Sequence, residues 1–309
     1  MISVLHLGTI DYGTALQLQQ SLVELRKEHR ISDVLLLLEH SPVITFGRNA
    51  SRKNLLASHD LLHKKGVEFF ETNRGGDITF HGPGQLVGYP IFDLRGFSPR
   101  IGAVEFVRRM EEALIRLCGD LGIACERICG LTGVWTQRSE ASICTADESL
   151  RPPEPHGPGE QRKIAAIGVH ISGGVTSHGF ALNVTTDLDY FKLIVPCGIT
   201  DRSVTSVAEE LAGKRPGPTM NGVAHAASLN FGRAFEQQML WLESIDALLS
   251  TAVSSGTAGE SDSDSPSDKD SSIESTTIGV PLKAPKDVRD LRHEQRAPQG
   301  SSKDEIFLA

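Results

Sequence analysis

A glycine-rich run from Arg74 to Gln85, RGGDITFHGPGQ, lies between two apolar segments that have the pattern of β-strands. Its twelve residues include four glycines, a proline, an arginine and a histidine. Glycine allows backbone conformations and close approaches that other residues do not. The run lacks the GK[ST] ending of a phosphate-binding loop and the G-x-G-x-x-G pattern of a dinucleotide-binding turn. Two interpretations stay open: a backbone that wraps a ligand, and a hairpin loop without chemistry.

The hydrophobic pattern predicts strands and helices without regular alternation. Apolar or alternating runs predict strands over 2–7, 33–38, 43–46, 67–71, 85–94, 133–136, 163–171 and 175–184. Amphipathic spacing predicts helices over 11–29, 54–65, 101–121, 203–212 and 221–250. Pro90 falls inside a predicted strand, where we expect an edge or a bulge. Pairs of strands followed by helices predict an α+β fold, with a mixed β-sheet flanked by helices.

The composition divides the chain into a folded body and a polar end. We expect residues 1–250 to form a single catalytic domain, because the hydrophobic residues concentrate there. Residues 138–160 contain four prolines and predict an inserted, mobile surface loop. Residues 251–309 are rich in Ser, Asp, Glu, Lys and Pro, which predicts a disordered low-complexity tail.

Charge and cysteine content exclude several classes of function. The net charge is −8, and residues 251–309 contribute −4 of it through 11 acidic and 7 basic residues. The body is therefore mildly acidic, which argues against nucleic-acid binding. No apolar stretch is long enough for a membrane span, and the N-terminus lacks the pattern of a targeting segment. Five cysteines are an odd number and fit a reducing compartment, so we expect a cytoplasmic protein.

Two residues are candidates for nucleophilic chemistry. Cys197 follows a proline and precedes a glycine, which places a thiol on a turning backbone; a buried structural cysteine is the alternative. Lys163 is the one charge that opens an apolar strand. It could be a strand-edge lysine that discourages aggregation. Alternatively, its ammonium could lower the pKa of a nearby thiol.

Other polar residues carry weaker signals. His81 and His178 could donate hydrogen bonds to a carbonyl group or could be buried, bonded histidines. The spacing of the remaining Cys and His residues matches no strong zinc pattern. We therefore expect no metal.

Four motifs then occur in order: RGG-x-x-T-x-HGPGQ at Arg74–Gln85, a strand-opening lysine at Lys163, HG-x-A-x-N at His178–Asn183 and PCG at Pro196–Gly198. Together they resemble the lipoyl(octanoyl) transferase family. The first motif is highly specific, whereas PCG alone would be weak. The resemblance covers about residues 1–245 and leaves out the tail.

This resemblance implies a fold like the catalytic domain of biotin and lipoate protein ligases. It implies transfer of an octanoyl or lipoyl group from acyl carrier protein to a lysine of lipoyl domains, in oxo-acid dehydrogenases and the glycine cleavage H protein. The group would pass through a thioester on Cys197, tuned by Lys163, without a cofactor. The implied acyl-binding residues are Arg74, Gly75, Gly76, Asp77, Ile78, Thr79, Phe80, His81, Ala166, Ile167, Gly168, Gly179, Phe180 and Ala181.

Two alternatives come from other functional classes. An ATP-dependent lipoate or biotin-type ligase would share the fold, but it would need an ATP site and no nucleophilic cysteine. A catalytically inactive module that binds lipoyl domains would need neither Lys163 nor Cys197, and both are present.

Overall fold

Strand β2 (Asp33–His40) explains why the sheet has helices on both faces. Its residues Val34 to Leu38 are all fully buried. Because side chains alternate along a strand, this run needs a hydrophobic layer on each side. Leu35 and Leu37 pack in one core cluster, while Leu36 and Leu38 pack in another. A continuous apolar run in the sequence therefore became a central, doubly covered strand.

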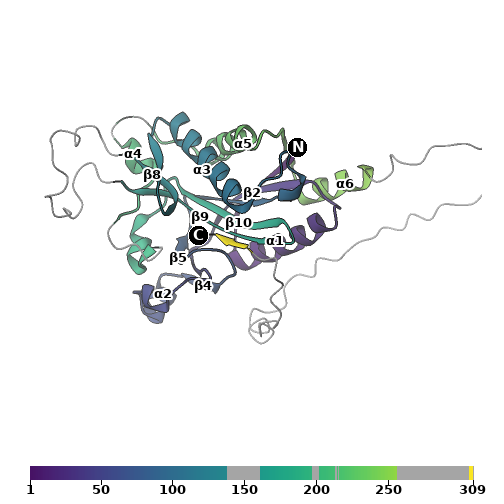
Figure 1. Cartoon of the computed structure of the whole chain (residues 1–309). Coiled ribbons are helices and arrows are strands. Elements are labelled where there is room, and N and C mark those ends of the chain that lie inside the picture. The colour runs from purple at the N-terminus through teal and green to yellow at the C-terminus, as the bar shows by residue number, and fades with distance from the viewer. Residues whose placement is uncertain (138–160, 197–201, 213, 215, 256–305, 309) are drawn as a thin grey trace, which may run out of the picture.

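The computed structural model describes residues 1–137, 161–196, 202–212, 214, 216–255 and 306–308 (Figure 1). Among the described residues, the large sheet has the order β11-β1-β2-β6-β10-β9-β8-β7. β12 also pairs with β9, further along that strand than β8 does. β11, β1 and β2 run parallel, and the pairs from β2 to β7 are antiparallel. These strands are β1 (Ile2–Ile10), β6 (Gln85–Ile91), β7 (Cys125–Ile128), β8 (Leu131–Thr136), β9 (Lys163–Ser172), β10 (Val175–Asn183), β11 (Met239–Trp241) and β12 (Ile306–Leu308).

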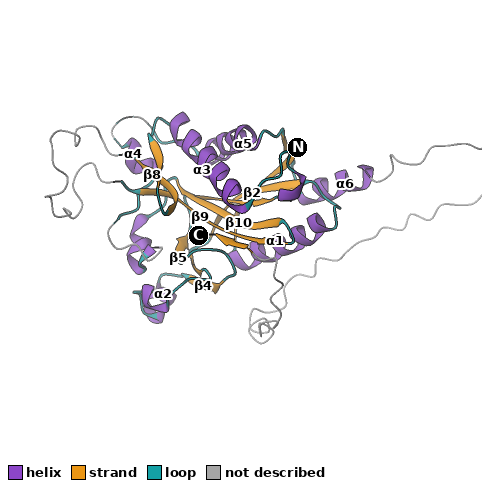
Figure 2. Ribbon diagram, in the orientation of Figure 1, coloured by secondary structure: helices purple, strands orange, loops and turns teal. Residues whose placement is uncertain are grey.

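A second, small sheet has the order β4-β3-β5 and lies beside the large one (Figure 2). It consists of β3 (Val43–Phe46), β4 (Glu68–Glu71) and β5 (Ile78–His81). The short helix α2 (His59–Lys64) and the 3₁₀ segments η1 (Arg52–Asn54) and η5 (Leu188–Leu193) belong to the same region, and a third hydrophobic cluster fills it. The predicted α+β fold with a mixed sheet is confirmed.

The helices cover the large sheet in two layers. α1 (Tyr12–Lys27) packs on one face, against β10 and β6, and begins where the Asp11 side chain accepts a 2.8 Å hydrogen bond from the backbone N–H of Thr14. α3 (Ala103–Asp120) and α5 (Met220–Phe235) pack together on the other face. The ring centroids of Phe106 and Phe235 lie 5.6 Å apart there. Burial of each such ring stabilises the fold by about 1.5–3 kcal/mol.

Three predicted helices differ clearly in the structure. The helix expected over 221–250 ends at Phe235, because Glu236 adopts a left-handed conformation with φ 55°. The chain then forms β11 at the sheet edge and resumes as α6 (Ile245–Ser255). The helix expected over 54–65 is shorter and is preceded by η1. The helix expected over 203–212 is shortened to α4 (Val207–Leu211). The remaining element is the 3₁₀ segment η2 (Leu94–Gly96).

Pro90 does not mark an edge, because β6 lies between β2 and β10 in the middle of the sheet. The β6–β10 ladder ends at Gly88, so the proline has no ladder bond to make on that side. The side-chain hydroxyl of Thr176 instead donates a 2.7 Å hydrogen bond to the Pro90 carbonyl.

The segments expected to lack regular structure fall mostly outside the described residues. The whole of 138–160 does so, as does 256–305. Within the expected tail, 251–255 continue helix α6, and 306–308 form β12 as an antiparallel neighbour of Val169–Ile171. The apolar triplet IFL at 306–308 suits a strand, unlike the polar sequence before it. Among the described helices, none is long and apolar enough to cross a membrane.

Candidate functional site

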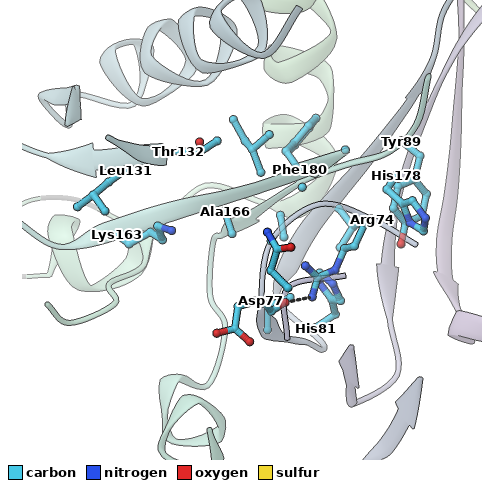
Figure 3. A pocket seen from close by; sticks show the side chains of 18 of the residues that line it. Arg74, Asp77, His81, Tyr89, Leu131, Thr132, Lys163, Ala166, His178 and Phe180 are labelled. Atoms are coloured by element: carbon cyan, nitrogen blue, oxygen red, sulfur yellow. Dashed lines mark hydrogen bonds between the residues drawn. The ribbon is translucent and has the colours of Figure 1, made fainter. Parts of the chain in front are cut away.

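The glycine-rich run contains a strand, and this strand divides its side chains between two surroundings. Within β5, Thr79 and His81 line a cavity of about 310 Å³ (Figure 3). The alternate residues Ile78 and Phe80 point the other way and pack in the core of the small sheet. The run is therefore not a plain loop. Its strand presents every second side chain to the cavity, and Arg74, Gly76 and Asp77 before the strand line the cavity as well.

Strands β9 and β10 form the opposite wall. Ala166, Ile167 and Gly168 of β9 pair with Ala181, Phe180 and Gly179 of β10 respectively, and all six line the cavity.

The absence of a side chain at Gly168 lets the glycine-rich run lie directly on β9. A Cβ atom there would be 2.8 Å from the carbonyl oxygen of Gly75. The Gly75 N–H donates a 2.9 Å hydrogen bond to the carbonyl of Val169. Gly75 thus joins the two walls through its backbone and does not itself line the cavity, whereas Gly76 does.

Arg74 holds the run in this position. Its buried guanidinium donates to the carbonyl oxygens of Thr45, Asp77 and Gly75 at 2.7, 2.7 and 2.9 Å. Asp77 accepts hydrogen bonds from the backbone N–H groups of Ile78 and Ser51, at 2.7 and 3.2 Å, and from the side-chain amide of Asn54. Both charged residues line the cavity, yet their hydrogen bonds chiefly fix the loop.

The two histidines of the motifs are buried and neutral. The ring of His81 donates from Nδ1 to the Gln85 side-chain oxygen at 2.8 Å, and burial lowers its pKa to about 3. His178 has a left-handed backbone, and its Nε2 donates to Oδ1 of Asn73 at 2.8 Å. Burial lowers the pKa of His178 to about 3 as well. The two rings themselves therefore carry no charge near neutral pH.

Lys163 lies at one end of the cavity, and His178 and Tyr89 lie at the opposite end (Figure 3). It is the first residue of β9 and is only 8% exposed. Its ammonium nitrogen is 4.9 Å from the centroid of the Trp135 ring. Lys163 also lines a second, smaller cavity together with Pro196.

Cys197 lies outside the described residues, but both of its flanks are placed. On one side, Val195 donates a 2.7 Å backbone hydrogen bond to Asn54. On the other side, Thr205 donates a 2.9 Å backbone hydrogen bond to the carbonyl of Lys163. Pro196, before the cysteine, therefore lines the smaller cavity together with Lys163, and Thr205, after it, is bonded to the backbone of Lys163.

Several lining residues were not identified from the sequence: Tyr12, Asn49, Val87, Tyr89, Gly130, Leu131 and Thr132. Tyr12 opens helix α1, and burial raises its pKa to about 12. Val87 and Tyr89 share one face of β6, since they are two residues apart, but only the sheet order shows which face meets the cavity. Among the described residues, no cluster of His, Cys, Asp and Glu has the arrangement of a metal site.

The chain matches the family model described as the lipoyl protein ligase A/B catalytic domain over residues 11–232. It is 61% identical to an octanoyltransferase of Koribacter versatilis, in an alignment that covers 81% of this chain and 91% of that protein. It is 56% identical to an octanoyltransferase of Acidobacterium capsulatum, over 81% of this chain and 96% of that one. The chain belongs to the octanoyltransferase family.

The fold of this octanoyltransferase family member agrees with solved structures. A bi-partite lipoate protein ligase from Thermoplasma acidophilum superposes with a TM-score of 0.55 at 17% identity, covering 82% of this chain and 90% of that one. This similarity shows a shared fold. In this octanoyltransferase family member, residues from each of the predicted segments 74–81, 166–168 and 179–181 line one cavity, but Gly75, Ile78 and Phe80 do not.

Proposed function

We propose that this chain transfers an octanoyl group from a carrier protein to a lysine of a lipoyl domain. The observation that carries the proposal is the cavity itself. Three segments far apart in the sequence enclose it, and Lys163 lies at one end beside the flanks of Cys197. The octanoyltransferases at 61% and 56% identity support the same activity.

The cavity suits an acyl chain. Val87, Ile167, Phe180 and Ala181 supply apolar surface, and Ala166 and Gly168 leave room beside the backbone of β9. Burial keeps the nearby histidines neutral, so the chain does not meet a buried charge at those two rings. A cavity of about 310 Å³ is at the small end of the range for ligand sites, which fits a slender substrate.

The first chemical step exchanges one thioester for another. The thiolate of Cys197 attacks the carbonyl carbon of the carrier-bound octanoyl group, and the carrier thiolate leaves. The product is an octanoyl thioester on Cys197, formed without ATP because the donor is already activated. Lys163 would favour the thiolate through its positive charge.

The second step makes an amide. The neutral amine of the acceptor lysine attacks the thioester carbonyl, the Cys197 thiolate leaves, and the amine loses its proton to solvent. An amide is more stable than a thioester, so this step runs downhill. A covalent intermediate shared by two substrates predicts ping-pong kinetics.

An adduct measurement tests this proposal. The purified protein is mixed with octanoyl-loaded acyl carrier protein, and the intact mass and the Cys197 peptide are measured. We expect one octanoyl group on wild-type protein and none on Cys197→Ser. Addition of a lipoyl domain should then discharge the adduct onto a lysine. No adduct on the wild-type protein, with carrier of proven loading, would contradict the proposal.

The same assay separates the alternatives. A ligase would use free octanoate with ATP and would modify the lipoyl domain with the Cys197→Ser variant. An inactive binding module would retain the lipoyl domain without transferring an acyl group.

A further inference from the structure

Strand β8 lies beside the start of β9, where Lys163 is located. Trp135 pairs with Lys163 and Val134 pairs with Ala165, with a register shift between the two pairs. This irregularity brings both Trp135 and Gly133 against the lysine side chain. The Lys163 ammonium is 4.9 Å from the centroid of the Trp135 ring.

Gly133 leaves the space that the lysine side chain fills. A Cβ atom at Gly133 would be 3.1 Å from Cε of Lys163 and 3.6 Å from its Nζ. It would also be only 2.7 Å from the carbonyl oxygen of Ala165. The backbone of Gly133 has φ +127°, a conformation that other residues rarely adopt. A larger residue there would displace either the β8–β9 contact or the lysine.

Among the described residues, no hydrogen bond of the indole explains why position 135 is a tryptophan. Trp135 is 1% exposed, and its Nε1 has no hydrogen-bond partner among the described residues. Two cations instead lie near the ring: Lys163, and the Arg202 guanidinium carbon at 5.7 Å. The negative π-face of an indole attracts cations, most strongly where water is excluded. The ring face is therefore the part of Trp135 that contributes to the site.

A buried carboxylate fixes the backbone of this strand. Glu111 of α3 is 1% exposed and accepts a 3.2 Å hydrogen bond from the Gly133 N–H. Arg108 and Arg127 donate to the same carboxylate at 2.7 and 3.1 Å, which balances its charge. The position of Gly133 is thus tied to helix α3 and does not depend on the strand ladder alone.

We propose that Trp135 and Gly133 are positioning residues that fix the Lys163 ammonium at the reacting end of the acyl cavity. The proposal rests on the function given above, in which Lys163 promotes ionisation of Cys197. Trp135 holds the charged end of the lysine side chain, and Gly133 makes room for its stem. Neither residue is assigned contact with the acyl group.

The test measures the reactivity of Cys197 without any substrate. Alkylation by iodoacetamide is followed on the Cys197 peptide from pH 6 to 10 in wild type, Lys163→Ala, Trp135→Leu, Trp135→Phe and Gly133→Ala. Gly8→Ala is the matched control, because Gly8 also lies at a register shift in a strand of the large sheet, has φ +63° and has open space where its Cβ would be.

We expect Trp135→Leu and Gly133→Ala to move the alkylation midpoint of Cys197 to higher pH, in the direction of Lys163→Ala. We expect kcat for octanoyl transfer to fall about tenfold, with KM for the carrier changed less. Trp135→Phe should stay closer to wild type than Trp135→Leu in both the alkylation midpoint of Cys197 and kcat, because phenylalanine keeps an aromatic face beside the lysine. Gly8→Ala should match wild type in the pH profile and kcat.

The outcomes separate this proposal from the proposed function. If Lys163→Ala shifts the profile while Trp135→Leu and Gly133→Ala do not, positioning by β8 is wrong and the role of Lys163 stands. If Lys163→Ala leaves the profile unchanged, the role of the lysine fails. Should Trp135→Leu not fold, as judged by thermal unfolding, Gly133→Ala decides: a wild-type pH profile and kcat in that variant would overturn the proposal.

Discussion

The side-chain amide of Gln85 donates a 2.9 Å hydrogen bond to Oδ1 of Asn183, across 98 positions of sequence. The side-chain amide of Asn183 in turn donates a 2.9 Å hydrogen bond to the carbonyl of Thr205. The N–H of Thr205 bonds the carbonyl of Lys163. The buried side-chain amides of Gln85 and Asn183 therefore connect the glycine-rich run to Thr205, which follows Cys197 in the sequence.

Replacing Asn183 by Ala should disturb both stability and transfer. The Gln85 donor and the Thr205 carbonyl would lose a buried partner, at about 1–3 kcal/mol for each group. Asn230→Ala is a suitable control, because Asn230 is equally buried and bonds Asp120 and Ala226 within the α3–α5 layer. Thermal unfolding should show both variants destabilised, and only Asn183→Ala should lose octanoyl transfer per folded molecule. Equal transfer rates in the two variants would contradict a role for Asn183 in ordering the site.

Gly168→Ala should impair transfer while the protein stays folded. The added methyl group would lie 2.8 Å from the Gly75 carbonyl oxygen, so the glycine-rich run must move off β9. Displacement of a substrate wall by a few tenths of an ångström to 1 Å should lower kcat/KM roughly tenfold to a hundredfold. Gly119→Ala, in a helix with open space around the new methyl group, should leave kcat/KM unchanged. Steady-state transfer assays on both variants provide the comparison.

Acidification should weaken the fold before His40, His81 or His178 is charged in the native state. Burial lowers the pKa of His40 to about 4, and those of His81 and His178 to about 3. The unfolded chain binds these protons near pH 6.5, whereas the native protein does not. Stability is therefore full above pH 6.5 and falls as the pH drops toward 4 and 3.

The slope from each histidine approaches about 1.4 kcal/mol per pH unit below pH 6. Denaturant unfolding measured between pH 5 and 8 checks this prediction. His40→Gln should reduce the slope by about one proton. A free energy of unfolding that stays constant from pH 7.5 to pH 5 would be incompatible with neutral, buried rings.

Ala166→Leu should shorten the acyl chain that the protein accepts. Ala166 lies between Lys163 and Gly168 on β9 and lines both cavities. A leucine there would fill space beside the chain, so hexanoyl carrier should compete better against octanoyl carrier than it does with wild type. Competition between the two loaded carriers, read by the mass of the modified lipoyl domain, measures the preference. An unchanged product ratio would place the acyl chain elsewhere.

The motif residues could be identified from the sequence, but their arrangement in space could not. The fold class and most strands of the large sheet followed from apolar runs such as 33–38 and 163–171. The strand inside the glycine-rich run did not, because its four residues, Ile78–His81, give too short a hydrophobic pattern. Trp135 and Tyr12 gave no functional signal, since each resembles an ordinary core residue. Their place beside Lys163 and beside the cavity depends on strand register and helix packing over long sequence distances.

Strand β9 carries on one stretch of backbone both Lys163, at the proposed reacting end, and Gly168, where the glycine-rich run lies against the strand. A strand advances about 3.3 Å per residue, so these two points are about 16 Å apart. The strand is hydrogen-bonded on both sides, to β10 along its length and to β8, Gly75 and β12 in turn. Under the proposed function, β9 therefore sets the length of the acyl chain that fits, in steps of one residue, and a larger side chain between Lys163 and Gly168 would shorten that length.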